Sequence, residues 1–99
     1  ADPYVWDFGK VQEGEIVKHD FEITNKSSQA VKIGPITTSC GCTASVADKK
    51  VLEPGEVTAV HVTFKTKKYK GQVSQFVYVS TDNPDESVIR LTVKGEVIP

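Results

Sequence analysis

The feature that most constrains the fold is an alternation of apolar and polar residues, interrupted by turn residues about every ten positions. In residues 15–25 the apolar parity is occupied by Val17, His19, Phe21 and Ile23. Successive side chains of a strand point to opposite faces. This segment is therefore predicted to be a strand with one buried face and one polar face.

The same alternation predicts further strands along the chain. The positions expected to face inward are Val60, Val62, Phe64, Ile89, Leu91, Val93 and Val97. Val31 and Ile33 begin another strand, and in the strand over residues 73–81 one parity contains Val77 and Val79 and the other Phe76 and Tyr78. A short strand is expected over residues 44–46. Gly34-Pro35 interrupts the strand that starts at Val31, and because proline lacks an N–H this strand is expected to lie at an edge or to bend there. Pro54-Gly55 predicts a tight turn.

The fold class predicted is all-β, because no stretch shows an apolar helical stripe with caps. With a short aromatic strand at residues 4–8, about seven strands are expected, which suits an immunoglobulin-like sandwich of two antiparallel sheets. Residues 1–99 are expected to form a single immunoglobulin-like domain. Two cysteines one residue apart cannot form the disulfide that bridges the sheets of an antibody domain.

Charge and hydropathy exclude several partners. Twelve basic against thirteen acidic residues give a net charge of -1, which disfavours nucleic acid and anionic membranes as partners. No apolar run approaches the roughly 20 residues of a membrane span. The absence of methionine suggests either a secreted or periplasmic protein trimmed of its leader or one domain of a longer chain.

Cys40-Gly41-Cys42 contains both cysteines and is the main candidate for chemistry. Two thiolates separated by glycine can converge on one soft ion, and Cu(I) accepts two thiolate ligands where Zn²⁺ normally takes four ligands. A copper ion is therefore the cofactor that the pair would bind. The same pair could close a small, strained and easily reduced disulfide. The simpler alternative is two reduced thiols that pack a strand.

The histidines and other polar residues add weak signals. Alternation places His19 inward, where it could be a third metal ligand, and His61 outward. No nucleophile motif or phosphate loop is present, so catalysis is not expected. The lysine-rich segment 65–70 is predicted to be a solvated loop. Asn25-Lys26-Ser27 matches a glycosylation acceptor, a pattern common by chance.

Several short motifs, in order, resemble the bacterial family known as domain of unknown function fifteen-seventy-three. They are Phe8-Gly9-x-Val11-x-x-Gly14-Glu15, Phe21-x-Ile23-x-Asn25, Ser39-Cys40-Gly41-Cys42-Thr43, Pro54-Gly55-Glu56, Thr81-Asp82-Asn83-Pro84 and Leu91-x-Val93-x-Gly95. The resemblance implies an immunoglobulin-type sandwich similar to the major sperm protein and to the ASPM, SPD-2 and Hydin domains. It also implies a periplasmic or extracellular location in bacteria, often as part of a longer or lipid-anchored chain, but no activity.

The sequence thus favours a non-enzymatic, exported structural or protein-binding module that offers its sheet edges and loops to a protein partner. The alternative is a copper(I)-binding or thiol-redox module centred on Cys40 and Cys42. Replacing both cysteines by serine distinguishes the two, because only the thiol module would lose its response.

Overall fold

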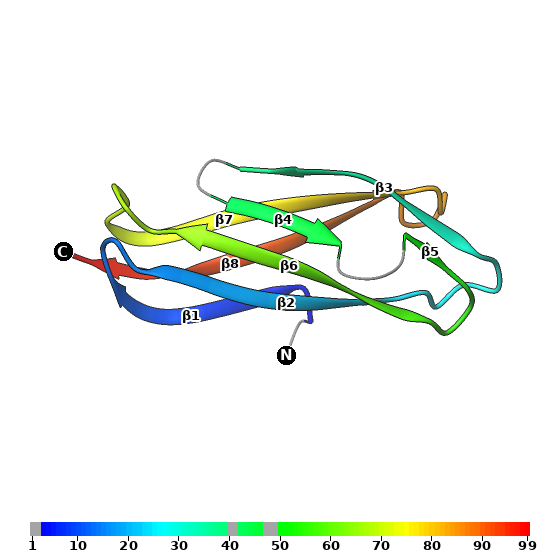
Figure 1. Ribbon diagram of the computed structural model, residues 1–99, viewed down its shortest axis with the longest axis horizontal. Coiled ribbons are helices and arrows are strands. Elements are labelled where there is room, and N and C mark those ends of the chain that lie inside the picture. Colours follow the sequence, from blue (N-terminus) through cyan, green and yellow to red (C-terminus); the bar gives the residue numbers. More distant parts are fainter. Residues whose placement is uncertain (1–2, 40–41, 47–49) are drawn as a thin grey trace.

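The computed structural model describes residues 3–39, 42–46 and 50–99 and contains two packed β-sheets (Figure 1). The strands are β1 (Val5–Gln12), β2 (Ile16–Thr24), β3 (Val31–Thr38), β4 (Cys42–Val46), β5 (Val51–Leu52), β6 (Val57–Lys65), β7 (Gly71–Thr81) and β8 (Val88–Ile98). One sheet has the order β1-β8-β7-β3-β5 and the other β2-β6-β4. The predicted all-β, immunoglobulin-like sandwich is therefore confirmed. The described residues include no helix that is long and apolar enough to cross a membrane.

The direction of β1 differs from the prediction of antiparallel sheets. β1 pairs with β8 in parallel, with Val5 opposite Thr92 and Gln12 opposite Ile98. The alternation of apolar and polar residues does not distinguish a parallel from an antiparallel strand, because it depends only on which face of the sheet each side chain occupies. β1 continues into β2 of the other sheet, so no hairpin forces it to run antiparallel to β8.

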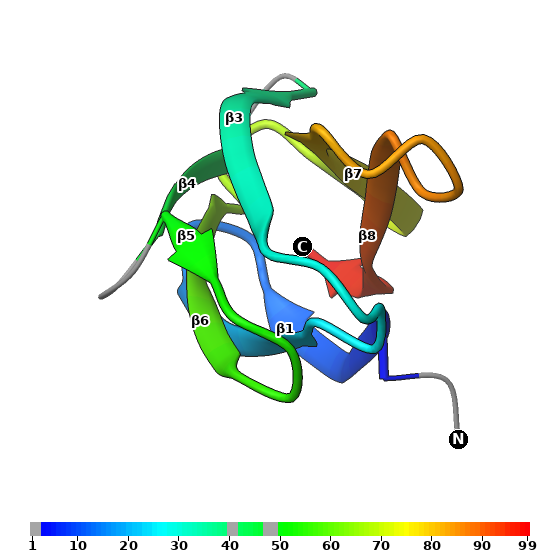
Figure 2. The ribbon, with the colours of Figure 1, turned by 90° about the vertical axis from the view of Figure 1, so that its right-hand side faces the viewer.

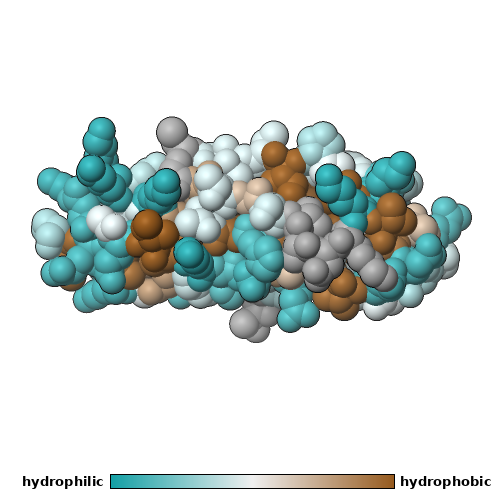
Figure 3. Space-filling view, viewed as in Figure 1, coloured by the Kyte–Doolittle hydropathy of each residue, from teal (hydrophilic) through white to brown (hydrophobic). Residues whose placement is uncertain are grey.

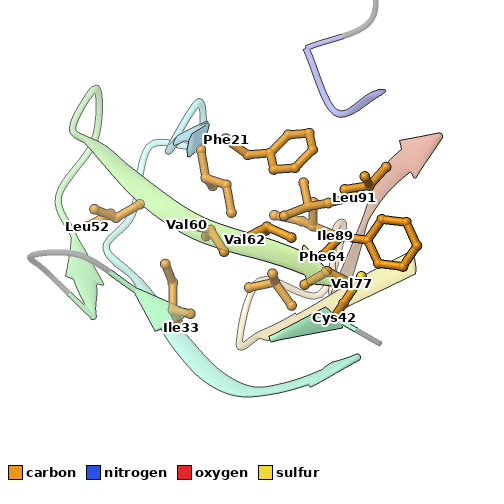
Figure 4. Close-up of a cluster of buried hydrophobic side chains, with 13 residues drawn as sticks. Phe21, Ile33, Cys42, Leu52, Val60, Val62, Phe64, Val77, Ile89 and Leu91 are labelled. Carbon is orange, nitrogen blue, oxygen red and sulfur yellow. The ribbon is translucent and has the colours of Figure 1, made fainter. Parts of the chain in front are cut away.

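The core lies between the sheets and follows the predicted parity. β6 alternates without a break, with Thr58, Val60, Val62 and Phe64 buried. Figure 4 shows side chains from both sheets meeting in this layer, with Cys42 beside Phe64 and Val77. Every position expected inward in β2 is buried or half-buried, including His19.

The strand that contains Gly34-Pro35 bends as predicted. Its pairing with β7 shifts between Ile33 and Ile36, which leaves Pro35 within a bulge. β5 covers the other edge of β3 only at Val31 and Lys32. The N–H of Ile33 also donates to the carbonyl of Lys50, at 2.6 Å. Beyond Ile33, β3 has a ladder on one side alone, so Pro35, which lacks an N–H, leaves no sheet hydrogen bond unmade on the uncovered side.

Buried polar side chains fasten the loops at the two ends. Asn25 is 4% exposed, and its Nδ2 donates to the carbonyls of Gln29 and Leu52, both at 2.8 Å. At the opposite end, the buried Thr66 hydroxyl donates to the carbonyl of Glu15 at 2.6 Å and accepts the N–H of Gly14 at 3.0 Å. Much of the motif pattern thus encodes loop structure.

Candidate functional site

Cys42 is a core residue at the start of β4. It is 6% exposed, lies opposite Phe64 in the register and belongs to the main hydrophobic cluster (Figure 4). Its thiol is free, and burial raises its pKa from 9.0 to about 11. The thiol is therefore protonated at neutral pH, whereas the thiolate is the nucleophile and the metal ligand. Cys40, the other half of the predicted metal or redox pair, lies outside the described residues.

His19 makes aromatic contacts at the opposite side of the sandwich. Its ring stacks on Trp6, with centroids 4.6 Å apart and planes 9° apart, and meets Phe21 edge-on at 4.7 Å. β6 separates β2 from β4, and His19 lies opposite Val62 of β6 whereas Cys42 lies opposite Phe64. Two strand spacings across and two residues along the strand put their backbones roughly 12 Å apart. The structure does not bring the predicted third ligand to Cys42.

His61 lies on the outer face of the three-stranded sheet, as predicted from parity. Its Nδ1 is 2.6 Å from Oδ1 of Asp20, and both side chains are more than half exposed. Within the described part of the chain, no group of three or more His, Cys, Asp or Glu residues is arranged to hold a metal ion. An exposed pair of this kind contributes little to stability.

Two other sequence signals acquire structural explanations. The amide nitrogen of Asn25 is buried and donates two hydrogen bonds, so the glycosylation pattern is inaccessible in the folded domain. In the lysine-rich loop all four lysines are exposed, while Tyr69 packs edge-on against Phe64 with centroids 5.1 Å apart. The aromatic residue thus anchors the loop and leaves its lysines in solvent.

The least protected surface of the described domain is the side where β3 and β4 lie, which we call the open side and define by residues 34–39 and 42–45. β3 is near this edge of one sheet, and β4 forms the edge of the other (Figures 1 and 2). Ile36 and Ala44 are partly buried apolar residues between them. Edge strands carry unpaired backbone groups that can accept another strand.

The backbone direction of β4 can be read from Cys42. Its N–H donates to the carbonyl of Ser39 at 3.3 Å, and its carbonyl accepts the hydroxyl of Thr38 at 3.0 Å. Both groups therefore point away from β6. Because backbone groups of alternate residues in an antiparallel strand point the same way, the N–H and carbonyl of Ala44 face the free edge.

The open side also lacks the charges that normally protect a sheet edge. No charged residue occurs between Lys32 and Asp48 in the sequence, whereas β2 carries Lys18, Asp20 and Glu22. In Figure 3, teal hydrophilic side chains lie at both ends and across the middle of the face, whereas the upper margin between the ends is mostly white to pale. The absence of charge from residues 33–47 is a sequence signal that is separate from the alternation of apolar and polar residues.

The end of β3 is held firmly. The N–H of Ser39 donates to the carbonyl of Phe76 at 2.9 Å, and the Ser39 hydroxyl accepts the N–H of Phe76 at 3.0 Å. The Ser39 hydroxyl also hydrogen-bonds the side-chain oxygen of Gln75. These bonds tie this part of the open side to β7, so a partner would meet an ordered surface.

The two packed sheets and their strand order define an immunoglobulin-like β-domain. Within that class, the chain belongs to the family described as "Protein of unknown function (DUF1573)", whose model matches residues 2–97. The resemblance inferred from the motifs is therefore confirmed. No curated protein matches the sequence.

Solved structures share the fold at low sequence identity. A protein of unknown function from Porphyromonas gingivalis W83 has a TM-score of 0.81 and 21% identity over 94% of this chain and 44% of its own. The secreted serine protease VesC from Vibrio cholerae has a TM-score of 0.71 and 16% identity, over 92% of this chain and 21% of its own. The chain thus spans less than half of either protein.

A human domain extends the similarity. The ASH/PapD-like domain 7 of human CEP192 has a TM-score of 0.64 and 18% identity, and the match covers 96% of this chain and 81% of that one. This match supports the predicted relation to the ASPM, SPD-2 and Hydin domains in fold.

Proposed function

We propose that this domain is a non-enzymatic, exported protein-binding module whose open side accepts an extended segment of a partner protein. The observation that carries the proposal is the uncharged free edge of β4 beside the partly uncovered β3. Addition of a strand to a sheet edge is a common mode of peptide recognition, in which backbone hydrogen bonds provide affinity.

The contacts define the chemistry of the partner segment. Its backbone would pair with the N–H and carbonyl of Ala44, and alternate side chains would enter the space beside Cys42 and Ile36. That space is apolar and has no charged neighbour in residues 33–47. The segment is therefore a neutral strand with small or aliphatic residues at every second position.

Export rests on separate support. The motif resemblance implies a bacterial envelope or extracellular context, and one structural neighbour is described as secreted. We therefore place the module in the periplasm or outside the cell.

Site-specific cross-linking tests the proposal. A photoreactive amino acid is placed at Thr43 on β4, or at Lys18 on β2 as the control, and the domain is irradiated in an envelope extract of the cells that produce it. We expect one dominant cross-linked peptide from Thr43 alone. A synthetic copy of that peptide should bind the wild type and lose at least tenfold affinity to Ala44→Pro.

Ala44→Pro removes an N–H that faces the free edge and leaves the β6 ladder intact. Thermal unfolding and circular dichroism check that this variant folds. Equal cross-linking from Thr43 and Lys18, or unchanged peptide affinity in Ala44→Pro, would overturn the proposal.

A further inference from the structure

A cavity of about 380 Å³ lies at the end of the sandwich where the β2–β3 loop, the β7–β8 turn and residues 3–4 meet. Figure 2 looks onto this end. Its aliphatic lining comes from both sheets and includes Ile23, Val31, Ile33, Leu52 and Ile89, beside Pro3 and Tyr4. Its polar lining includes Lys26, Asn83, Asp85 and Glu86. The volume lies within the roughly 300–1,000 Å³ typical of ligand pockets.

Hydrogen bonds hold the rim in place on both sides. Asn25 ties the β2–β3 loop to Leu52, and its Oδ1 accepts the N–H of Ser27 at 2.9 Å. Across the cavity, the Thr81 hydroxyl donates to the carbonyl of Glu86 at 2.5 Å and accepts the N–H of Asn83 at 3.1 Å. A rim ordered in advance lowers the entropic cost of binding.

The charge of the rim is unbalanced. Asp85 and Glu86 are exposed, and in the described part of the chain no salt bridge ties either carboxylate to Lys26. The neighbouring Asp82 carboxylate accepts the N–H of Lys32 at 2.7 Å and adds a further negative charge. The apolar interior of the cavity and the negative charge of its rim are complementary to a partner segment in which an apolar side chain is followed by a cationic one.

We propose that this cavity receives an aliphatic side chain of a partner protein whose next residue is lysine or arginine. The chain segment lies over the rim, the aliphatic group contacts Val31 and Ile89, and the cation faces Asp85 and Glu86. The inference deepens the proposed protein-binding function, on which it rests. It concerns the end of the sandwich, whereas the strand-addition site lies along the open side.

NMR titration of the ¹⁵N-labelled domain with acetyl-Leu-Arg-amide tests the proposal. We expect saturable shifts at residues 24–27, 52 and 83–89. Acetyl-Leu-Glu-amide and acetyl-Gly-Arg-amide should each bind at least tenfold more weakly, because the first reverses the charge and the second lacks the apolar group. Shifts elsewhere, or equal affinity for the three probes, would overturn the inference.

Charge reversal provides the matched comparison. The double variant Asp85→Lys, Glu86→Lys changes exposed side chains only and should prefer acetyl-Leu-Glu-amide over acetyl-Leu-Arg-amide. The control Glu22→Lys, Glu96→Lys makes the same change in net charge on outer faces away from the cavity and should keep the original preference. An equal change of preference in both would show a general charge effect and overturn the site. If none of these probes binds the cavity while cross-linking at Thr43 persists, the cavity proposal fails and the strand-addition proposal for the open side still stands.

Discussion

The space between the two sheets is covered by different kinds of side chain on the two long sides of the sandwich. On the side formed by β1 and β2, the ring of Trp6 stacks on His19 and is tilted against Phe8, with centroids 4.6 and 5.9 Å apart. On the open side, Ile36 and Ala44 lie between β3 and β4. The first side is closed by aromatic rings, and the second is covered by small and aliphatic groups.

The edge strands differ in the same sense. β2 alternates its inward residues with Lys18, Asp20 and Glu22, and charged residues discourage pairing with another strand. β1 has a bulge between Asp7 and Lys10, with Gly9 at a φ of 78°. β4 has neither charge nor a bulge in its pairing with β6. Charges and a bulge thus protect the edges on one side, whereas β4 lacks both, which is why the proposed strand addition is placed at β4.

The largest expected effect concerns the packing of the closed side. The Phe8 ring lies over Gly95, where an added Cβ would be 2.4 Å from a ring carbon. Gly95→Ala should lower the free energy of unfolding by about 2–3 kcal/mol, because the ring must leave its place in the core. Urea denaturation measures the loss. Phe8→Leu should restore part of it in the double variant, and simple additivity of the two changes would contradict this packing.

Truncation of a side chain should lower the free energy of unfolding more on the side formed by β1 and β2 than on the open side. Trp6→Ala removes a ring from a contiguous aromatic cluster and should cost about 2 kcal/mol, while Ile36→Ala on the open side should cost about 1 kcal/mol. Thermal and urea unfolding give both values. A larger loss for Ile36→Ala would mean that the open side carries more of the stability than its composition suggests.

Adding charges to the open edge should affect binding more than folding. Thr43→Lys with Ser45→Lys places two charges on exposed positions of β4, whereas β2 already carries charges at Lys18, Asp20 and Glu22. We expect a change in unfolding free energy within about 0.5 kcal/mol. Affinity for the cross-linked peptide should fall at least tenfold by calorimetry. Glu22→Gln on β2 is the control, and an equal loss there would contradict the assignment of the edge.

The buried thiol predicts a small pH effect. Because the pKa of Cys42 is about 11 in the folded chain against 9.0 for an ordinary cysteine, the folded chain holds the proton more tightly. This contribution to stability is complete below pH 9 and is lost as the pH rises towards 11. In a Cys40→Ser background, the difference in unfolding free energy between Cys42 and Cys42→Ala should therefore shrink over this interval.

The same background tests thiol chemistry. At neutral pH the raised pKa alone lowers the thiolate fraction about a hundredfold, so Cys42 should react slowly with a disulfide reagent until the protein is unfolded in urea. The copper prediction needs both cysteines and is tested on the wild type by Cu(I) titration against a competing chelator. Stoichiometric binding that is lost in Cys40→Ser, Cys42→Ser would favour the metal-binding alternative over a packing role for Cys42.

The alternation of apolar and polar residues allowed much of the fold to be predicted, because each side chain of a strand must face either the core or solvent. It placed Phe21, Val62 and Leu91 inward and His61 outward, as observed. It did not indicate that β1 runs parallel to β8. The two residues of β5 were also missed, since so short a strand shows no alternation.

The candidate site was less predictable, because it depends on which strands end a sheet. Cys42 stood out by its spacing, yet its surroundings of Phe64 and Val77 come from other strands. Asn25 resembled a glycosylation acceptor until its hydrogen bonds to Gln29 and Leu52 were known. Gly95 acquires its role from Phe8, which lies far from it in the sequence.

Alternation and turn residues are local properties of the chain, so the sequence was enough to predict most of the strands and their buried faces, and its ordered motifs were enough to predict the family. Tertiary structure alone decided that β4 is an edge, that β5 leaves most of β3 uncovered, and that Ile23, Leu52 and Ile89 meet in one cavity. Edges and cavities arise from the order in which distant segments pair, and no local pattern specifies that order.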